Sequence, residues 1–519
     1  MHRYTQDTER LAQRITRLAL DRMRMDAPLD GPRTPVELQA RAGITITPEG
    51  LGGDEALRRW VDVLAPATMS VDHPRYLAFI PGAPTEVSTL FDLLVGVQSI
   101  YGGSWLESSG AVYAENQALR WISDLAGLPA AAGGCFVPGG TTGNLSALVA
   151  ARHAAREARG GDRPGRWRVD DGRVRLGRQC HAPAARAVAA AGRAGGVPSC
   201  DQRRQVAGGA AGNLSALVAA RHAAREARGG DRPGRWRVAL TAETHSSVVY
   251  ALEQVMDVDV LYVPADERGR MTGAALAQAL DEAGDDGVFA AVATSGTTNT
   301  GVIDDLAGIA EVCRERGLWM HVDGAYGGAA LAAPSVRHLF AGIEHADSFI
   351  VDPHKWLFAP FDCCALVYRD PEVARRAHTQ HAGYLDTINE TSEWNPSDYA
   401  VHLSRRARGL PFWFSLAVHG TDAYRDAVEQ TLAVARAGAD EIRSRPYVEL
   451  LEEPELTVLI FRRTGWTAAD YAAWSSGLLA QGYAFVTPTT HRGEPCTRMA
   501  IVNPRTTVSD IAGILATMA

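Results

Sequence analysis

The stretch Ser348-Phe-Ile-Val-Asp-Pro-His-Lys-Trp-Leu-Phe358 carries a short apolar run that ends just before a lysine. The chain has 52 Lys and Arg residues, and Lys355 is the only lysine among them. Arginine replaces lysine where only charge is needed, but a guanidinium is too basic to attack a carbonyl. We therefore expect Lys355 to be a covalent catalyst. The alternative is a bias towards arginine codons that left one lysine by chance.

The composition indicates a soluble globular enzyme. The 519 residues are 46% hydrophobic and 22% charged, enough for a large core and two or three domains. The net charge of -8 disfavours a nucleic-acid partner. The seven cysteines form neither a CxxC pair nor a disulfide-framework spacing, so we expect a reducing compartment and no metal centre. We predict a cytoplasmic protein without a membrane partner, because the chain shows no signal-peptide pattern and no apolar run of transmembrane length.

Apolar runs alternate with amphipathic segments through the middle of the chain. The predicted strands and helices are, in order, 288–294, 303–316, 318–323, 335–343 and 348–351. Continuous apolar strands that alternate with helices predict an α/β fold with a mainly parallel sheet covered on both faces. Ligands of such sheets bind at the carboxyl ends of the strands, where Thr294, Asp323 and Lys355 fall.

Three regions surround or contain this pattern. Residues 1–75 are expected to form a helical segment that makes a dimer contact, because residues 5–24 carry apolar residues at helical spacing and need a partner surface. Residues 76–410 are expected to form the large domain. Residues 411–519 combine a long helix with strand and helix patterns, which predicts a small α/β domain.

A glycine-rich turn lies within residues 136–148, between a short apolar strand and a helix. Small residues there would let backbone N–H groups approach a phosphate at the helix N-terminus, and the Thr141 and Thr142 hydroxyls would add donors. The turn lacks the Gly-Lys-Ser/Thr of a P-loop, so it is a weak signal by itself.

Residues 143–169 recur letter for letter as residues 212–238, at an offset of 69. Two perfect copies indicate a recent duplication or a sequence-assembly fault rather than a repeat fold. Residues 170–208 between them have no aromatic residue, no Ile and a single Leu, which cannot supply a packed core. We expect one copy in the fold and about 69 surplus residues looped out or poorly packed, and we favour the first copy as the phosphate loop.

Asp323, Lys355 and His245 together predict a pyridoxal phosphate site. The cofactor needs an amine to hold its aldehyde and a carboxylate to pair with its pyridine nitrogen, which makes the ring an electron sink. His245, just after a predicted strand, would cover the ring, and residues 139–144 would hold the phosphate. Asp323 alone could be a helix cap and His245 alone a loop histidine, but their joint occurrence favours the cofactor.

Four motifs resemble the group II pyridoxal-phosphate amino-acid decarboxylases, the superfamily of the aromatic-L-amino-acid and glutamate decarboxylases. They are Asp-Pro-His-Lys-Trp (352–356), His-Val-Asp-Gly-Ala-Tyr (321–326), Thr-Ser-Gly-Thr-Thr (294–298) and Thr-His-Ser-Ser-Val (244–248). The resemblance runs from about residue 50 to the end, apart from the insert. It implies the fold type I architecture, a seven-stranded-type sheet, a homodimer, and decarboxylation of an amino-acid substrate to an amine and CO₂.

Individual roles are also implied by this resemblance. Lys355 resembles the Schiff-base lysine, Asp323 the partner of the pyridine nitrogen, and His245 the catalytic histidine stacked on the ring. The remaining cofactor-binding positions are matched by Ala325, Thr141, Thr142, Thr298 and His354. Tyr399 resembles the tyrosine of a mobile loop that protonates the product carbon.

The substrate pocket is expected to be apolar. Its candidates are Tyr76, Phe79, Ile80 and Trp105, which favour an aromatic or other bulky amino acid. Two alternatives stay open: another fold type I activity, such as an aminotransferase or lyase, and a homologue impaired by the insert beside the phosphate loop.

Overall fold

The computed structural model describes residues 2–159, 169–170, 173–174, 236–284, 287–380 and 393–519. Its centre is a seven-stranded sheet in the order β1-β9-β8-β7-β6-β4-β5. The strands are β1 (Gly133–Val137), β4 (Arg237–Leu240), β5 (Asp259–Tyr262), β6 (Val288–Thr294), β7 (Trp319–Asp323), β8 (Ser348–Val351) and β9 (Cys364–Tyr368). Only β9 runs against its neighbours, so the predicted mainly parallel α/β sheet is confirmed.

Helices cover both faces of this sheet. Val292 of β6 packs in a cluster with Leu148 of α6 (Gly140–Ala158). Its neighbour Ala293 packs in a different cluster with Ile309 of α11 (Leu306–Arg316). Successive strand residues point to opposite faces, so α6 and α11 lie on opposite sides. Every residue of β6 is buried, which explains its uninterrupted apolar sequence.

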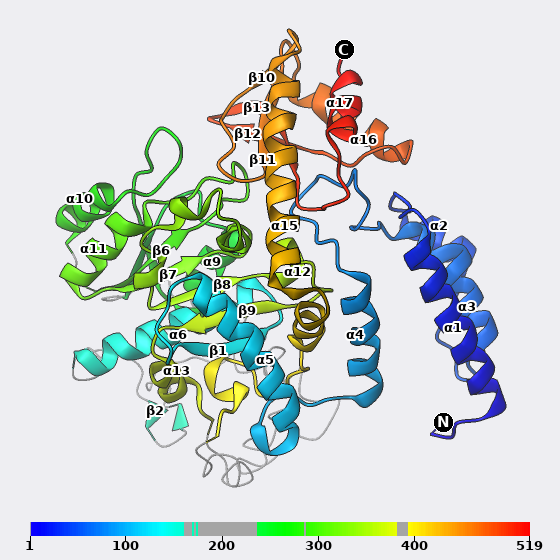
Figure 1. Cartoon of the computed structure of the whole chain (residues 1–519), viewed down its shortest axis with the longest axis horizontal. Coiled ribbons are helices and arrows are strands. Elements are labelled where there is room, and N and C mark those ends of the chain that lie inside the picture. The colour runs from blue at the N-terminus through cyan, green and yellow to red at the C-terminus, as the bar shows by residue number, and fades with distance from the viewer. Residues whose placement is uncertain (1, 160–168, 171–172, 175–235, 285–286, 381–392) are drawn as a thin grey trace, which may run out of the picture.

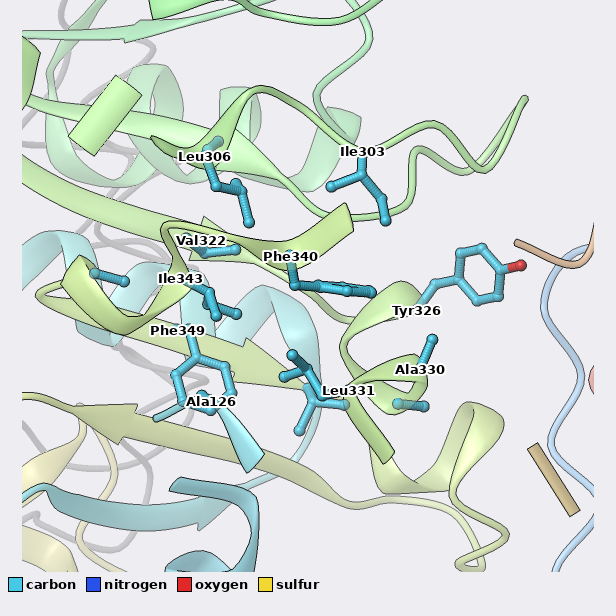
Figure 2. Packing of buried hydrophobic residues seen from close by; sticks show 14 of the residues in the cluster. Ala126, Ile303, Leu306, Val322, Tyr326, Ala330, Leu331, Phe340, Ile343 and Phe349 are labelled. Carbon is cyan, nitrogen blue, oxygen red and sulfur yellow. The ribbon is translucent and has the colours of Figure 1, made fainter. Parts of the chain in front are cut away.

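The α11 face holds the largest core cluster. In Figure 2, Val322 of β7 and Phe349 of β8 lie among Leu306, Phe340 and Ile343. The prediction of a helix at 335–343 is wrong. The structure has two short 3₁₀ helices in this region, Arg337–Phe340 and Ile343–His345. Gly342 separates them with a φ of 102°, and a Cβ on it would lie 2.3 Å from the Ala307 backbone nitrogen. The backbone at Gly342 therefore lies close against α11, and its left-handed conformation interrupts the predicted helix.

Further helices lie around the large sheet. They are α5 (Trp105–Leu125), α9 (Ser246–Tyr250), α10 (Gly273–Ala283), α12 (Pro353–Trp356) and α13 (Pro371–His378). A short pair, β2 (Val169–Asp170) and β3 (Arg173–Val174), forms a separate two-stranded sheet.

A long helix, α15 (Leu410–Arg443), leads from the large sheet to a second one, as Figure 1 shows. The second sheet is antiparallel in the order β10-β11-β13-β12. Its strands are β10 (Val448–Leu450), β11 (Val458–Arg463), β12 (Thr487–His491) and β13 (Glu494–Ala500). The same region contains the helices α16 (Ala468–Ala480) and α17 (Val508–Ala516).

The N-terminal helices lie at one side of the molecule (Figure 1). They are α1 (Gln6–Arg24), α2 (Pro35–Ala42) and α3 (Gly53–Arg59), followed by α4 (Glu86–Gln98). Neither α1 nor α3 has a buried residue, although the helix predicted at 5–24 is present. Among the described residues, no helix is both long and apolar enough to cross a bilayer.

Residues 143–158 of the first copy belong to α6, which follows β1 directly, while residues 160–168 lie outside the described residues. Of the second copy, residues 212–235 lie outside the described residues, and Arg237 and Val238 begin β4. The expectation of a looped-out surplus also falls outside the described residues.

Candidate active site

A cavity of about 370 Å³ opens at the carboxyl ends of β6, β7 and β8. Thr294, Asp323 and Lys355 line it together, as the strand-end argument predicted. The other lining residues are Pro138, Gly139, Gly140, Thr141, Asn144, Glu243, His245, Ser247, Gly296, Thr298, Ala325, Tyr326, Asp352, His354, Phe361 and Asp362.

The N-terminus of α6 forms one wall of this cavity. Gly139 is the N-cap of this 19-residue helix, and Gly140 is its first residue. A Cβ on Gly140 would lie 3.3 Å from Asp352 Oδ2 and 3.4 Å from Ala325 Cβ, so glycine keeps the backbone close to the wall opposite. Free N–H groups at a helix start bind anions, which suits the phosphate role predicted for this turn.

Only one of the two predicted threonines reaches the cavity. Thr141 lines it, whereas Thr142 is absent from the lining and its carbonyl accepts a hydrogen bond from Ser146 Oγ at 2.8 Å. Of the residues predicted to hold the phosphate, Gly139, Gly140 and Thr141 therefore line the cavity, and Thr142 does not.

Asp323 ends β7 with its carboxylate almost fully buried, at 5% exposure. Its Oδ2 accepts from Asn144 Nδ2 at 2.8 Å, and its Oδ1 accepts from the Ala325 backbone N–H at 3.1 Å. Both oxygens of this buried carboxylate therefore have a hydrogen-bond donor. Ala325 itself lines the cavity, as expected for a small residue beneath a flat ring.

Lys355 lies on α12, the single turn that follows β8. Its Nζ is 3.1 Å from Asp352 Oδ2. Burial would lower the pKa of the Lys355 ammonium, but the Asp352 and Asp323 carboxylates reverse this and raise the pKa. The amine is therefore protonated at neutral pH while Asp352 faces it.

Three further predicted residues also reach the cavity. His245 caps α9, and its Nδ1 lies 2.8 Å from Ser247 Oγ, which orients the ring. His354 places its Nδ1 2.7 Å from the Cys363 carbonyl oxygen. Thr298 lines the cavity from the turn after β6.

Tyr399 lies elsewhere. It is 3% exposed, and its ring stacks on Trp394 with centroids 4.1 Å apart. It belongs to a core cluster with Tyr368, whose hydroxyl donates to the Tyr399 carbonyl at 3.1 Å. Burial raises the pKa of its phenol well above the usual range. Because Tyr399 does not line the cavity, we do not assign it the role of proton donor.

None of the four expected pocket residues lines the cavity either. Tyr76 is buried against Phe485, and Ile80 packs in the main core. Phe79 is 58% exposed, and Trp105 starts α5 with its backbone N–H bonded to Asn395. The aromatic side chains that do line the cavity are Tyr326 and Phe361.

Two contacts were not predicted from the sequence: the ion pair of Asp352 with Lys355, and the hydrogen bond from Asn144 to Asp323. Asp352 stands in the quoted motif, but the pairing of its Oδ2 with Lys355 depends on the tight turn of α12. Asn144 stands in the glycine-rich stretch, and only the packing of α6 across the sheet brings it to Asp323, 179 positions away. The position of Asp352 three residues before Lys355 was the sequence signal that could have predicted this ion pair.

The residues present fit pyridoxal phosphate. The cavity joins a helix start for the phosphate, a carboxylate for the ring nitrogen and an amine for the aldehyde. Thr294 Oγ1 and Asp352 Oδ1 are buried without a hydrogen-bond partner among the described residues, so the site has polar groups to spare for a ligand.

Comparisons with known proteins agree with this chemistry. A family model described as the pyridoxal-dependent decarboxylase conserved domain matches residues 175–464, more than half of the chain. The chain belongs to this family. As a pyridoxal-dependent decarboxylase, it is a carboxy-lyase that uses pyridoxal phosphate.

Relatives of this decarboxylase are named for several different substrates. An aromatic-L-amino-acid decarboxylase of Bacillus atrophaeus is 24% identical over 461 residues, 86% of this chain and 80% of the relative. An L-2,4-diaminobutyrate decarboxylase of Acinetobacter baumannii is 24% identical over 492 residues, 92% and 86% of the two chains. An acidic amino acid decarboxylase of Bos taurus is 36% identical but covers only 39% of this chain and 40% of its own.

Solved structures share the fold. The Oryza sativa enzyme TDC, solved with PLP and tryptamine, aligns with a TM-score of 0.79 at 20% identity, covering 100% of this chain and 98% of that one. Mouse CSAD aligns with a TM-score of 0.77 at 22% identity, covering 99% and 98%. At these identities the likeness establishes the fold, and the decarboxylase fold type I prediction is confirmed.

Proposed function

We propose that this decarboxylase converts an aromatic or other bulky L-amino acid to its amine and CO₂, with Lys355 as the covalent catalyst. The observation that carries the proposal is the meeting of Lys355, Asp323 and the α6 N-terminus around one cavity. An amine that faces the cavity beside a buried carboxylate, at neighbouring strand ends, is the arrangement that the cofactor requires.

Each wall of the cavity has its own task. Gly139, Gly140 and Thr141 would hold the phosphate through backbone and hydroxyl donors. Asp323 would hold the pyridine nitrogen, while Ala325 and His245 would confine the ring. When bound, pyridoxal phosphate supplies an electron sink for the electrons that the departing CO₂ leaves behind. Lys355 holds a proton at Nζ, and Asp352 controls how readily it is lost.

The substrate class rests on two observations. Tyr326 and Phe361 line the cavity, and Phe361 is 60% exposed at its mouth, where it offers an apolar contact to a flat side chain. Relatives that are named aromatic-L-amino-acid decarboxylases, such as the one from Bacillus atrophaeus, act on that class.

The proposal is tested by incubating the purified protein and cofactor with a panel of L-amino acids and measuring CO₂. Aromatic amino acids should release the most CO₂, and Lys355→Arg should release none, because a guanidinium cannot form the covalent link. Full turnover by Lys355→Arg would overturn the assignment. A keto acid product instead of amine and CO₂ would indicate transamination.

A catalytically impaired homologue is the second candidate, and the exact duplication is what favours it. Deleting residues 143–211 joins Thr142 to Gly212 and restores the α6 sequence letter for letter, with Asn213 in the place of Asn144. If the surplus impairs the enzyme, this deletion variant should release CO₂ faster than the full chain. Equal rates would show that the surplus is tolerated.

We also propose a homodimer located in the cytoplasm. Leu90, Leu93, Leu94 and Val97 form an exposed apolar stripe on one face of α4. Such a stripe is costly to leave in water, and a second copy of the chain would cover it.

A further inference from the structure

A buried chain of hydrogen bonds supports Asp323 from behind. Asn144 Nδ2 donates to Asp323 Oδ2 at 2.8 Å, and Asn144 Oδ1 lies 2.8 Å from His321 Nε2. His321 Nδ1 lies 2.9 Å from Ser348 Oγ, which also accepts from Trp319 Nε1 at 2.8 Å. Asn144 is 1% exposed, and His321 and Ser348 are fully buried, so water does not compete for these bonds.

The direction of every bond follows from the chemistry of its ends. An ionised carboxylate only accepts, so Asn144 must turn its amide N–H₂ to Asp323 and its carbonyl oxygen to His321. His321 Nε2 must then carry a proton and donate. The ring stays neutral, because burial lowers the pKa of His321 to about 4.

The remaining bonds complete the same direction. A neutral ring protonated at Nε2 has an acceptor at Nδ1, so the Ser348 hydroxyl donates to it. The Trp319 indole N–H can only donate, and it donates to Ser348 Oγ. Every donor in this series of hydrogen bonds therefore points towards Asp323.

We propose that Asn144, His321, Ser348 and Trp319 are positioning residues that hold the Asp323 carboxylate aimed into the cavity. The proposal rests on the proposed pairing of Asp323 with the cofactor's ring nitrogen. Uniform donation towards a buried carboxylate fixes its rotamer. These four residues act through Asp323 and do not touch the cavity contents, except that Asn144 also lines the wall.

The first test needs no bound cofactor. In cofactor-free protein labelled with ¹⁵N-histidine, the His321 signal, assigned by its loss in His321→Gln, should show the neutral Nε2–H form from pH 8 down to about pH 5. A neutral Nδ1–H form, or titration near the ordinary histidine pKa, would overturn the directed chain.

The second test measures cofactor dissociation at neutral pH. Asn144→Leu removes one donor to a charged group, so the dissociation constant should rise about 10-fold or more. His321→Gln keeps an amide donor for Asn144 and should lose less affinity than His321→Leu. Equal losses in His321→Gln and His321→Leu would indicate a merely structural role and would sink the proposal.

A matched control separates support of Asp323 from general packing. Thr517→Val removes an indole-to-hydroxyl bond of the same kind, Trp474 Nε1 to Thr517 Oγ1 at 2.8 Å, near the C-terminal sheet. Ser348→Ala should weaken cofactor binding severalfold, while Thr517→Val should leave it unchanged. If CO₂ release fails in every variant and in the parent protein, the proposed function falls, yet the His321 signal still tests the hydrogen-bond chain.

Discussion

Lys355 and Asp352 form an ion pair inside the cavity, with 3.1 Å between Nζ and Oδ2. Asp352 is 2% exposed, so the pair is largely shielded from water. In this position Asp352 opposes the loss of the proton that Lys355 must give up before its amine can attack a carbonyl.

Asp352→Asn is therefore expected to lower the pKa of Lys355, because it removes the nearer of two carboxylates that raise it. The rate at which cofactor attaches to cofactor-free protein should then reach its plateau at a lower pH. Stopped-flow absorbance across pH measures this shift. Asp370→Asn is the control: Asp370 caps α13, and asparagine caps a helix equally well. An unchanged profile in Asp352→Asn would refute the control of Lys355 by Asp352.

Gly82 packs directly against the backbone of α12, the turn that carries Lys355. A Cβ on Gly82 would lie 1.9 Å from the His354 carbonyl oxygen and 3.3 Å from that of Lys355. Gly82→Ala should therefore displace α12 and cost about 1–3 kcal/mol of unfolding free energy, with weaker cofactor retention. Gly477→Ala in α16 meets nothing within 4 Å and should be neutral or slightly stabilising. Denaturant unfolding and cofactor titration of both variants check this.

Tyr399→Phe is expected to keep turnover within about twofold, since removing one hydroxyl outside the cavity alters no contact with the reacting atoms. Tyr399→Ala should instead lower the melting temperature, because it empties the space against Trp394. A large drop in kcat for Tyr399→Phe with an unchanged melting temperature would restore its assignment as the proton donor.

His321 should make the protein less stable in acid. Its pKa is about 4 in the folded protein against an ordinary value of 6.5. Between these values the unfolded chain binds more protons, so stability that is complete above pH 6.5 is lost as the pH falls towards 4. The loss should approach ~3 kcal/mol for this one group. His321→Gln should flatten the pH dependence of unfolding, whereas His419→Gln, at an exposed site, should leave it unchanged.

Leu93→Arg should convert the proposed dimer to a monomer, because a charge in the apolar stripe of α4 cannot be buried cheaply. Light scattering measures the mass. Tyr262→Arg, at an exposed aromatic residue at the end of β5, is the matched control and should leave the mass unchanged. A parent protein that is already monomeric would contradict the dimer.

The sequence by itself determined the sheet, the cofactor and the central pair of residues. Continuous apolar runs can be satisfied only by strands buried on both faces, and the ends of such parallel strands share one edge. Asp323 and Lys355 were therefore predictable as neighbours from their places after two apolar runs. The lone lysine added chemistry that arginine cannot perform.

Only the tertiary structure decided which other residues join them. Asn144 reaches Asp323 because α6 packs across the sheet, and His321 reaches Asn144 because alternate residues of β7 point to the α6 side. Tyr399 lies outside the cavity because its ring packs in the core against Trp394. Contacts between segments that are far apart in the chain depend on packing angles and burial, which local residue patterns do not encode.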